Sequence, residues 1–149
     1  MKIEEEIKQS NFRSPYQRAT INLIYTAGWL QNKQQGFFKP FGITSSQFNI
    51  LRILRGQHPN KISGAEIKSR MLDKNSDIPR LLDRLIKKNL ITKNPCPNDK
   101  RAADIVITQE GLDILGQIDS SLDESEKTYI HLSKEEALQL SSLLDKCRG

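Results

Sequence analysis

The stretch NPCPNDKRAADIVIT, residues 94–108, joins a turn to a strand. Its first half is rich in proline, asparagine and aspartate, which favour turns, and the adjacent cations Lys100 and Arg101 follow them. The β-branched run at residues 105–108 then predicts a strand, and the short segment Leu90–Lys93 predicts another before the turn. The pattern therefore predicts a β-hairpin whose projecting tip carries two positive charges.

Helices are predicted on both sides of the hairpin, because several helix starts carry a capping pattern. A serine or threonine hydroxyl can accept a backbone N–H while a Glu or Gln three residues later reaches back to the cap. Such pairs are Ser14 and Gln17, Thr44 and Gln47, Ser63 and Glu66, and Ser133 and Glu136. Together with apolar periodicity they predict helices over about residues 15–35, 45–55, 63–71 and 76–88, and two more after Thr108 and Ser133.

The helix predicted over residues 76–88 is amphipathic. Its apolar stripe consists of Ile78, Leu81, Leu82 and Leu85. Asn75 or Ser76 is the expected N-cap, and Pro79 is tolerated because first-turn N–H groups have no intrahelical partner. Asn89 is expected to end the helix in the left-handed conformation. The cations of this helix therefore lie on the side away from the leucines.

The order of these elements predicts the fold class. Three short helices followed by a two-stranded ribbon make a winged helix-turn-helix, here expected at residues 44–108. We predict one domain over residues 1–149, mainly α with a small β-hairpin, in which long N- and C-terminal helices flank this unit. In such a unit the helix at 76–88 lies in the major groove of DNA, which is about as wide as a helix with its side chains.

Positive charge is concentrated in the middle of the chain and negative charge at its end. Residues 74–101 hold eight Lys or Arg against three Asp, whereas residues 110–149 hold nine Asp or Glu against four Lys or Arg. With a net charge of +5, this distribution predicts a cationic working surface rather than a uniformly basic coat. Such a surface attracts phosphate backbones.

Other classes of protein are disfavoured. No apolar run approaches the roughly 20 residues of a membrane span, and the polar N-terminus lacks the apolar centre of a secretory signal, so we expect a cytoplasmic protein without a membrane partner. The cysteines, Cys96 and Cys147, are far apart and the histidines, His58 and His131, are isolated, which argues against a disulfide or a metal site. The sequence also carries no paired-carboxylate motif, phosphate loop or nucleophile elbow, so we expect neither an enzyme nor a cofactor.

At the level of motifs the chain resembles the MarR family of bacterial transcription regulators. The resemblance covers nearly the whole chain and is carried by SQFNILRIL (46–54), LLDRLIKKNLI (81–91) and NDKRAADIVITQEGLDIL (98–115). Its most specific part is Asp-x-Arg followed by an Ile/Val strand and then Thr-x-x-Gly. The resemblance implies a homodimer, with residues 1–43 and 109–149 as interlocked dimerisation helices, on a palindromic double-stranded DNA operator.

The resemblance also implies which residues contact DNA. Arg101 would insert at the minor groove while Asp99 holds its guanidinium in place. The expected DNA-binding residues are Asn75, Ser76, Asp77, Pro79, Arg80, Arg84, Lys100 and Arg101. For Arg84 the alternative is that its stem covers apolar surface, and Lys87 and Lys88 are expected to be a solvated helix end.

Two residues depart from the family pattern. Pro79 stands where the family usually has Ser or Thr, so DNA loses a hydroxyl partner there. Asp77 places a negative charge near phosphates, which would repel DNA unless its carboxylate accepts from a cytosine amino group or pairs with Arg80. Both departures keep open an alternative function, in which a winged-helix dimer acts through protein contacts without binding DNA.

The expected function is that of a sequence-specific transcriptional regulator, a dimeric repressor relieved by a small-molecule effector. Aromatic residues near the end of the first helix would either line the effector pocket or form core at the dimer seam. They are Tyr25, Trp29, Phe37, Phe38 and Phe41. A further alternative is a thiol-based redox sensor, in which oxidation of Cys96 alters the hairpin; a small side chain filling a strand end is the simpler interpretation.

Overall fold

The computed structural model describes residues 1–96 and 99–149, with side chains described for residues 1–95 and 103–149. The elements in chain order are α1 (Ile3–Glu6), α2 (Pro15–Phe38), the 3-10 helix η1 (Lys39–Phe41), α3 (Ser45–Gln57), β1 (Ile62–Ser63), α4 (Gly64–Arg70), α5 (Ile78–Lys87), β2 (Ile91–Cys96), β3 (Asp99–Ile107), α6 (Gln109–Tyr129) and α7 (Lys134–Arg148). The fold is mainly helical with one small antiparallel sheet of strand order β1-β3-β2. This is the predicted winged helix-turn-helix with long flanking helices.

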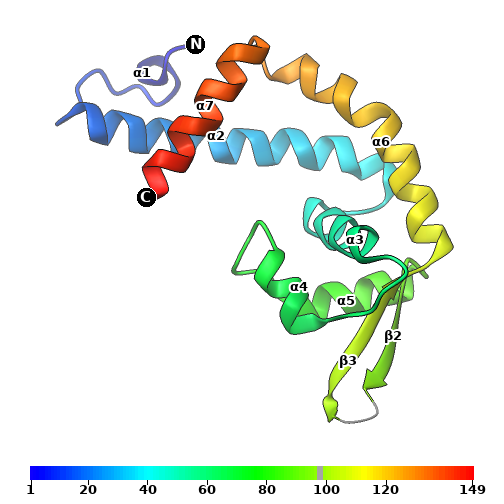
Figure 1. Ribbon diagram of the computed structural model, residues 1–149. Helices are drawn as coiled ribbons and strands as arrows, with labels where there is room; N and C mark the ends of the chain where they lie inside the picture. The colour runs from blue at the N-terminus through cyan, green and yellow to red at the C-terminus, as the bar shows by residue number, and fades with distance from the viewer. Residues whose placement is uncertain (97–98) are drawn as a thin grey trace.

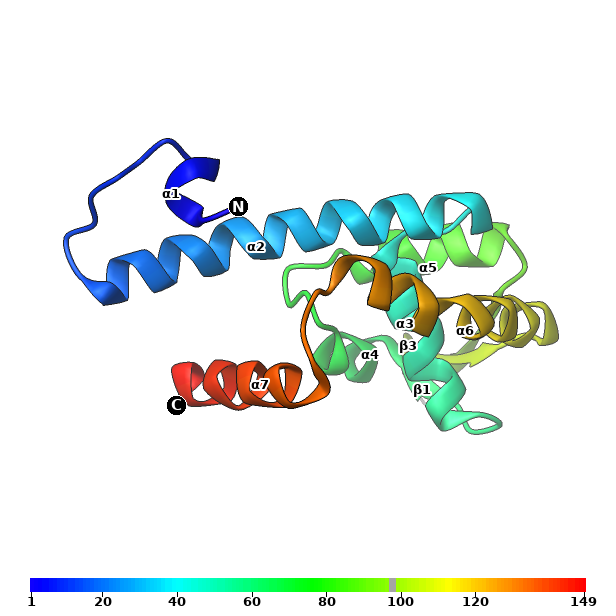
Figure 2. The same cartoon turned by 90° about the horizontal axis from the view of Figure 1, so that it is seen from above.

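The molecule has two parts that meet at the second half of α2 (Figure 1). The long helices α2, α6 and α7 form one part, and α3, α4, α5 and the sheet form the other. The ribbon of β2 and β3 projects from the second part, away from the long helices. Seen from above, α2 and α7 both extend beyond the winged unit on the same side (Figure 2). The flanking helices therefore leave much of their surface without a covering element.

The hydrophobic core joins the winged unit to α6. Its fully buried side chains come from α3, α4, α5, the sheet and α6, and include Ile50, Leu51, Leu54, Ile67, Leu85, Ile91, Ile105, Leu115 and Ile118. An ion pair between Arg55 of α3 and Asp119 of α6 lies at the rim of this core. Because α6 shares the core with α3, the start of α6 is packed as part of the winged unit.

Several element boundaries differ from the prediction. The first long helix continues through Gly36 to Phe38, because Phe38 is buried in the core and tertiary packing outweighs the low helix propensity of glycine. The helix predicted over residues 45–55 continues through Gly56 to Gln57. The short elements α1 and β1 were not predicted.

The hydroxyl caps were predicted correctly, and the reciprocal contacts only in part. Each of the four predicted Ser or Thr hydroxyls accepts the N–H of the Glu or Gln three residues later. The reciprocal bond to the cap residue forms at Thr44 and at Ser133. At the other two starts the long side chain bonds elsewhere: Gln17 accepts the N–H of Arg13, and Glu66 pairs with Arg70.

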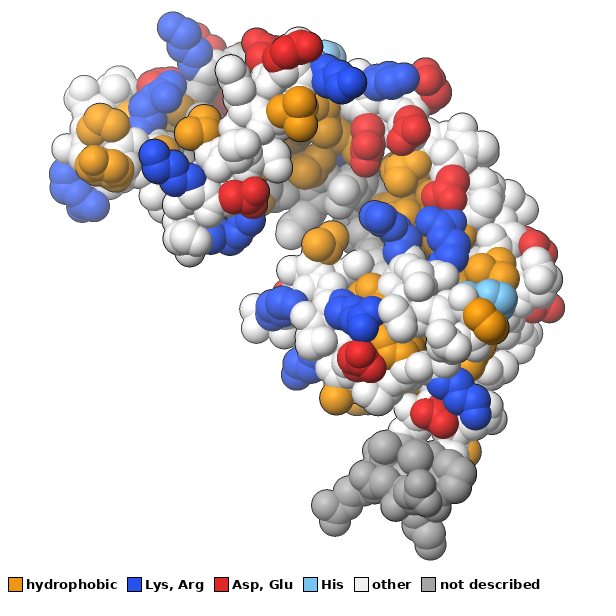
Figure 3. Space-filling view, viewed as in Figure 1, with side chains coloured by type: hydrophobic (Ala, Val, Ile, Leu, Met, Phe, Trp, Pro, Cys, Tyr) orange, Lys and Arg blue, Asp and Glu red, His pale blue; other side chains and the backbone are white. Residues whose placement is uncertain are grey.

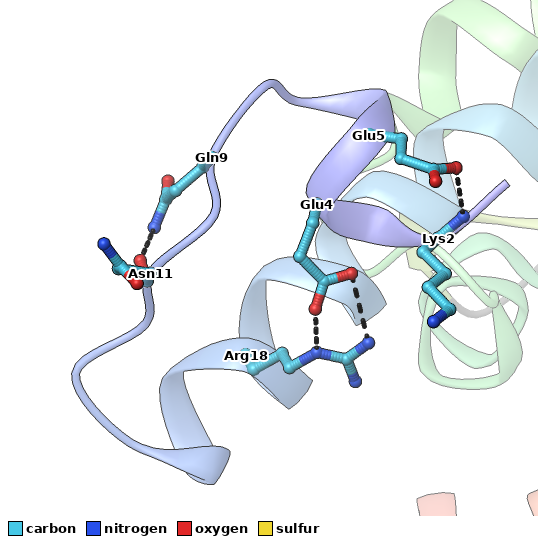
Figure 4. A network of polar contacts seen from close by, with 6 residues as sticks. All are labelled: Lys2, Glu4, Glu5, Gln9, Asn11 and Arg18. Atoms are coloured by element: carbon cyan, nitrogen blue, oxygen red, sulfur yellow. Dashed lines mark hydrogen bonds and ion pairs between the residues drawn. The ribbon is translucent and has the colours of Figure 1, made fainter.

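The N-terminal segment folds back onto α2 through α1 (Figure 4). Ile3 is buried, and the Arg18 guanidinium donates to both carboxylate oxygens of Glu4, at 2.6 and 3.3 Å. This guanidinium holds the pKa of Glu4 below its ordinary value. Farther along α2, the hydroxyl of Tyr25 donates to the Glu6 carboxylate at 2.6 Å, which raises the pKa of Tyr25.

The described part of the chain contains no helix that is both long enough and apolar enough to cross a membrane.

Candidate nucleic-acid interface

Helix α5 separates apolar and cationic residues onto opposite sides. Ile78, Leu82 and Leu85 are buried, whereas Arg80, Arg84 and Lys87 are exposed. The spacing of three and four residues explains this arrangement, because such residues share one face of a helix. Since its apolar side is fixed in the core, α5 presents its cations outward on a rigid support.

Asp77 is the N-cap of α5, which corrects the expectation that Asn75 or Ser76 caps this helix. One carboxylate oxygen of Asp77 accepts the backbone N–H of Arg80 at 3.2 Å. Pro79, in the first turn, is the sequence signal for this boundary, because proline is favoured at the start of a helix. A carboxylate also suits the positive end of the helix dipole. The charge of Asp77 is therefore explained by the helix start.

Asn75 and Ser76 lie in the turn between α4 and α5, and Asp73 orders this turn. The N–H of Asn75 donates to the Asp73 carboxylate at 2.9 Å, and the hydroxyl of Ser76 donates to the Asp73 carbonyl at 2.9 Å. Asn75 is exposed, and Ser76 is half-buried. Both residues thus lie at the start of α5 in a fixed turn.

The cations of α5 form no ion pair with any carboxylate whose side chain the structure describes. Within the described residues, no salt bridge involves Arg80, Arg84 or Asp77. The predicted pairing of Asp77 with the Arg80 side chain is thus not among the ion pairs observed. Arg84 is exposed, as a phosphate contact requires. These guanidinium groups keep their charge available for an anionic partner.

Lys88 is exposed, as predicted for a solvated helix end, but it also makes hydrogen bonds that were not predicted. Its ammonium group donates to the carbonyl of Gly42 and to the side-chain oxygen of Gln47, the latter at 3.1 Å. Sequence reasoning missed these contacts because the partners are 46 and 41 residues away in the chain. The end of α5 is therefore attached to the segment that joins α2 to α3.

The ribbon is anchored at its base by regular pairing. Its described register runs from Ile91 opposite Ile107 to Pro95 opposite Ala103. Both strands are longer than predicted, since Pro95 is accommodated in β2, an edge strand of the sheet. The side chains of Cys96, Asp99, Lys100 and Arg101 lie outside the described residues, so the predictions made for them remain predictions.

The aromatic residues divide between core and surface. Phe38 is buried, and Phe37 and Phe41 pack against the same core, which belongs to the single chain, so the prediction of core at the dimer seam remains a prediction. Tyr25 and Trp29 are partly exposed, and together with residues of α1 they line an open cavity of about 240 Å³.

Among the described residues, no group of three or more potential ligands is placed to hold a metal ion.

Comparison with known proteins agrees with this architecture. The sequence model of the MarR family matches residues 43–103. Over 127 residues the chain is 30% identical to the multiple antibiotic resistance protein MarR of Salmonella typhimurium, covering 83% of this chain and 87% of that protein. The chain belongs to the MarR family.

Solved structures of MarR proteins share the fold. The MarR transcription factor of Planctomyces limnophilus superposes with a TM-score of 0.72 at 27% identity, covering 91% of this chain and 98% of that one. A mutant of E. coli MarR, solved in complex with operator DNA, superposes with a TM-score of 0.71 at 26% identity, covering 85% of this chain and 91% of that one. This MarR protein is a DNA-binding transcriptional regulator and not an enzyme, as the sequence predicted.

Proposed function

We propose that this MarR protein is a dimeric repressor that binds a palindromic operator and places α5 in the major groove of each half-site. The observation that carries the proposal is the exposure of the guanidinium groups of Arg80 and Arg84 on α5, which form no ion pair among the described residues and lie away from the buried apolar stripe. Cations on a rigid helix can contact phosphates and base edges together, and such contacts supply both affinity and register. The operator DNA bound to E. coli MarR in its solved complex supports the same partner for this chain.

In this proposal the start of α5 lies closest to the bases. Asn75, Ser76 and Pro79 are placed there by the Asp73 turn and the Asp77 cap. Arg80 lies in the first turn, and Arg84 follows one turn later toward the backbone. Because Asp77 and Pro79 are both explained by the helix start, the two departures from the family pattern no longer favour a function without DNA.

The ribbon tip completes the proposed interface. From the sequence we infer that Lys100 and Arg101 reach the minor groove or its phosphates, and that Asp99 orients the guanidinium of Arg101. An exposed ion pair of this kind adds at most about 1 kcal/mol to stability, so the role of Asp99 would be to aim the arginine.

A homodimer is proposed because the flanking helices expose apolar side chains. On α2 these include Leu23 and Ile24, and on α7 they are Leu138, Leu140 and Leu143. In the space-filling view, hydrophobic side chains lie among charged ones on the part formed by the long helices (Figure 3). An apolar patch on a regulator of this size marks an interaction surface. A second copy would cover it and place two winged units on one palindrome.

A small effector that relieves repression belongs to the same proposal. The partly exposed rings of Tyr25 and Trp29 offer the apolar walls that ligand pockets commonly use.

The proposal is tested by binding to DNA from upstream of the protein's own coding sequence. Fluorescence anisotropy should give tight binding for the wild type and a loss of about 1–3 kcal/mol for Arg101→Ala. The pair Arg80→Ala and Arg84→Ala should weaken binding further. As a charge-matched control, Lys33→Ala with Lys127→Ala, on α2 and α6, should bind like the wild type. No binding by the wild type at low salt would refute the proposal.

A further inference from the structure

The ammonium group of Lys88 joins three helical segments that are distant in the sequence. Lys88 is the C-cap residue of α5. Its two acceptors are the Gly42 carbonyl, at the end of η1, and the Gln47 side-chain oxygen, in the first turn of α3. The Lys88 side chain therefore connects the end of α5 to the segment between α2 and α3.

Each acceptor belongs to a defined local structure. Gly42 ends η1 and has the left-handed φ of +72°, a conformation that favours glycine. Gln47 is only 2% exposed, and the same oxygen that accepts from Lys88 also accepts the N–H of Thr44 at 3.1 Å. In turn the N–H of Gln47 donates to the Thr44 hydroxyl at 3.1 Å. Lys88 thus bonds to one backbone oxygen and to one oxygen of a buried side chain.

The ammonium group of Lys88 is directed at two oxygen atoms of the protein. Two of its three donors are used by the two oxygens, and no carboxylate in the described part of the chain forms a salt bridge with it. Lys87 and Lys88 are both exposed, but no side-chain hydrogen bond or salt bridge of Lys87 is seen among the described residues. The two adjacent lysines carry the same charge but differ in their hydrogen bonds. A substitution of Lys87 is therefore a matched control for a substitution of Lys88.

We infer that Lys88 is a positioning residue for operator binding. It fixes the end of α5 to the α2–α3 junction and so sets the direction of α5 relative to α2. In the dimer proposed above, α2 belongs to the part shared by the two copies, so this bond also sets the distance between the two α5 helices. The inference rests on the proposed function.

The consequence for DNA concerns the spacing of the half-sites. Two recognition helices read two half-sites that must match their separation along the groove. A helix whose end is fixed by hydrogen bonds discriminates against operators with altered spacing. A looser helix tolerates such operators, but it must be ordered on binding, which costs free energy. Removing the ammonium group should therefore lower affinity and weaken discrimination between spacings.

The test compares Lys88→Met, which keeps the aliphatic stem, with Lys87→Met, which removes the same charge one residue earlier. Each is measured against the native operator and against one lengthened by one base pair at its centre. For Lys88→Met we expect about a tenfold loss on the native operator, the scale of one hydrogen bond to a charged group. We also expect a smaller affinity ratio between the two operators and an unchanged slope of affinity against salt. Lys87→Met should keep the wild-type ratio, and Lys88→Arg should restore it.

Two results would overturn the inference while leaving the proposed function intact. The first is that Lys88→Met keeps the wild-type ratio of affinities for the native and the lengthened operator. The second is that Lys87→Met changes this ratio as much as Lys88→Met does. A reduced salt slope in Lys88→Met would identify Lys88 as a phosphate contact instead and would also overturn it. If the wild type itself does not bind DNA, the proposed function fails first, so the two failures are distinguishable.

Discussion

The hydroxyl of Thr108 donates to the carbonyl of Asn89 at 2.7 Å, and this bond ties the end of α5 to the start of α6. The same hydroxyl accepts the N–H of Gly111 at 3.1 Å, so it also caps α6. The backbone N–H of Thr108 donates to the Leu90 carbonyl at 3.0 Å. Asn89 makes the connection possible because it adopts the left-handed conformation, with φ of +59°, as predicted from the sequence. The Thr-x-x-Gly motif is thus the joint between α5, the ribbon and α6.

Gly111 is required at this joint because no side chain fits there. A Cβ at this position would lie 2.4 Å from the Leu90 carbonyl oxygen and 2.6 Å from a side-chain carbon of Ile107. Both distances are far below van der Waals contact, and the first involves backbone that cannot rotate away. We expect Gly111→Ala to lower the free energy of unfolding by about 1–3 kcal/mol, measured by urea denaturation.

Gly116 of the same helix provides the control. Nothing lies within 4 Å of a Cβ built there. Gly116→Ala should raise the free energy of unfolding by up to about 1 kcal/mol, because alanine is the better helix former. Equal effects at the two glycines would contradict the steric role of Gly111.

The charge and the capping role of Asp77 can be separated by two substitutions. Asp77→Ala removes the acceptor for the Arg80 N–H, and we expect a loss of about 1 kcal/mol in stability. Asp77→Asn retains an oxygen acceptor but removes a negative charge beside the proposed phosphate contacts. Asp77→Asn should therefore lower the melting temperature less than Asp77→Ala does, measured by calorimetry, and should bind DNA more tightly than the wild type, measured by anisotropy. Weaker binding by Asp77→Asn would instead mean that the carboxylate accepts from a base.

The attachment of α1 to α2 should depend on pH through Glu4. The pKa of Glu4 is lowered by Arg18, so the pair stabilises the docked state fully above the ordinary glutamate pKa and loses this contribution as the pH falls through the lowered value. Trp29, the single tryptophan of the chain, lines the cavity beside α1 and reports the change. We expect its emission to shift in acid in the wild type.

Glu4→Gln tests this assignment without acid. The variant should give the undocked Trp29 emission already at neutral pH and should lack the acid transition. If Glu4→Gln and the wild type give superimposable pH profiles, the Glu4–Arg18 pair does not hold α1 in place.

The apolar surface of α7 should govern the oligomeric state. Leu143 is 64% exposed, and Leu138 on the same helix is 63% exposed. Leu143→Glu would place a charge in the proposed interface, and we expect light scattering at micromolar protein to change from dimer to monomer. Leu72→Glu, at an 87% exposed position between α4 and α5, should remain dimeric. If both variants are dimers, the dimer interface does not include Leu143 of α7.

Features governed by local sequence were predicted well. The caps at Thr44, Ser133 and Thr108 depend on side chains within three residues, and the sequence contains all of that information. The apolar stripe of α5 was likewise visible from its spacing. Where neighbouring residues competed for one role the prediction was wrong: Asp77 caps α5 instead of Asn75 or Ser76, because Pro79 sets where the helix begins.

Features that depend on tertiary contacts could not be predicted. The contacts of Lys88 need Gly42 and Gln47 to be brought together by folding, and no local pattern indicates them. The extension of α2 to Phe38 likewise reflects burial of one ring in a core that other elements supply. The sequence therefore indicated which side of α5 faces outward but not how the helix end is fixed.

The most direct test of the interface on α5 is the salt dependence of binding to the upstream palindrome. Because cations that contact phosphates release counterions, the logarithm of the affinity should fall linearly with the logarithm of the salt concentration. The variant carrying Arg80→Ala and Arg84→Ala should give a shallower slope, by about 0.9 for every phosphate that the protein no longer neutralises. A flat dependence in the wild type, or the same slope in this variant, would contradict the placement of α5 against DNA.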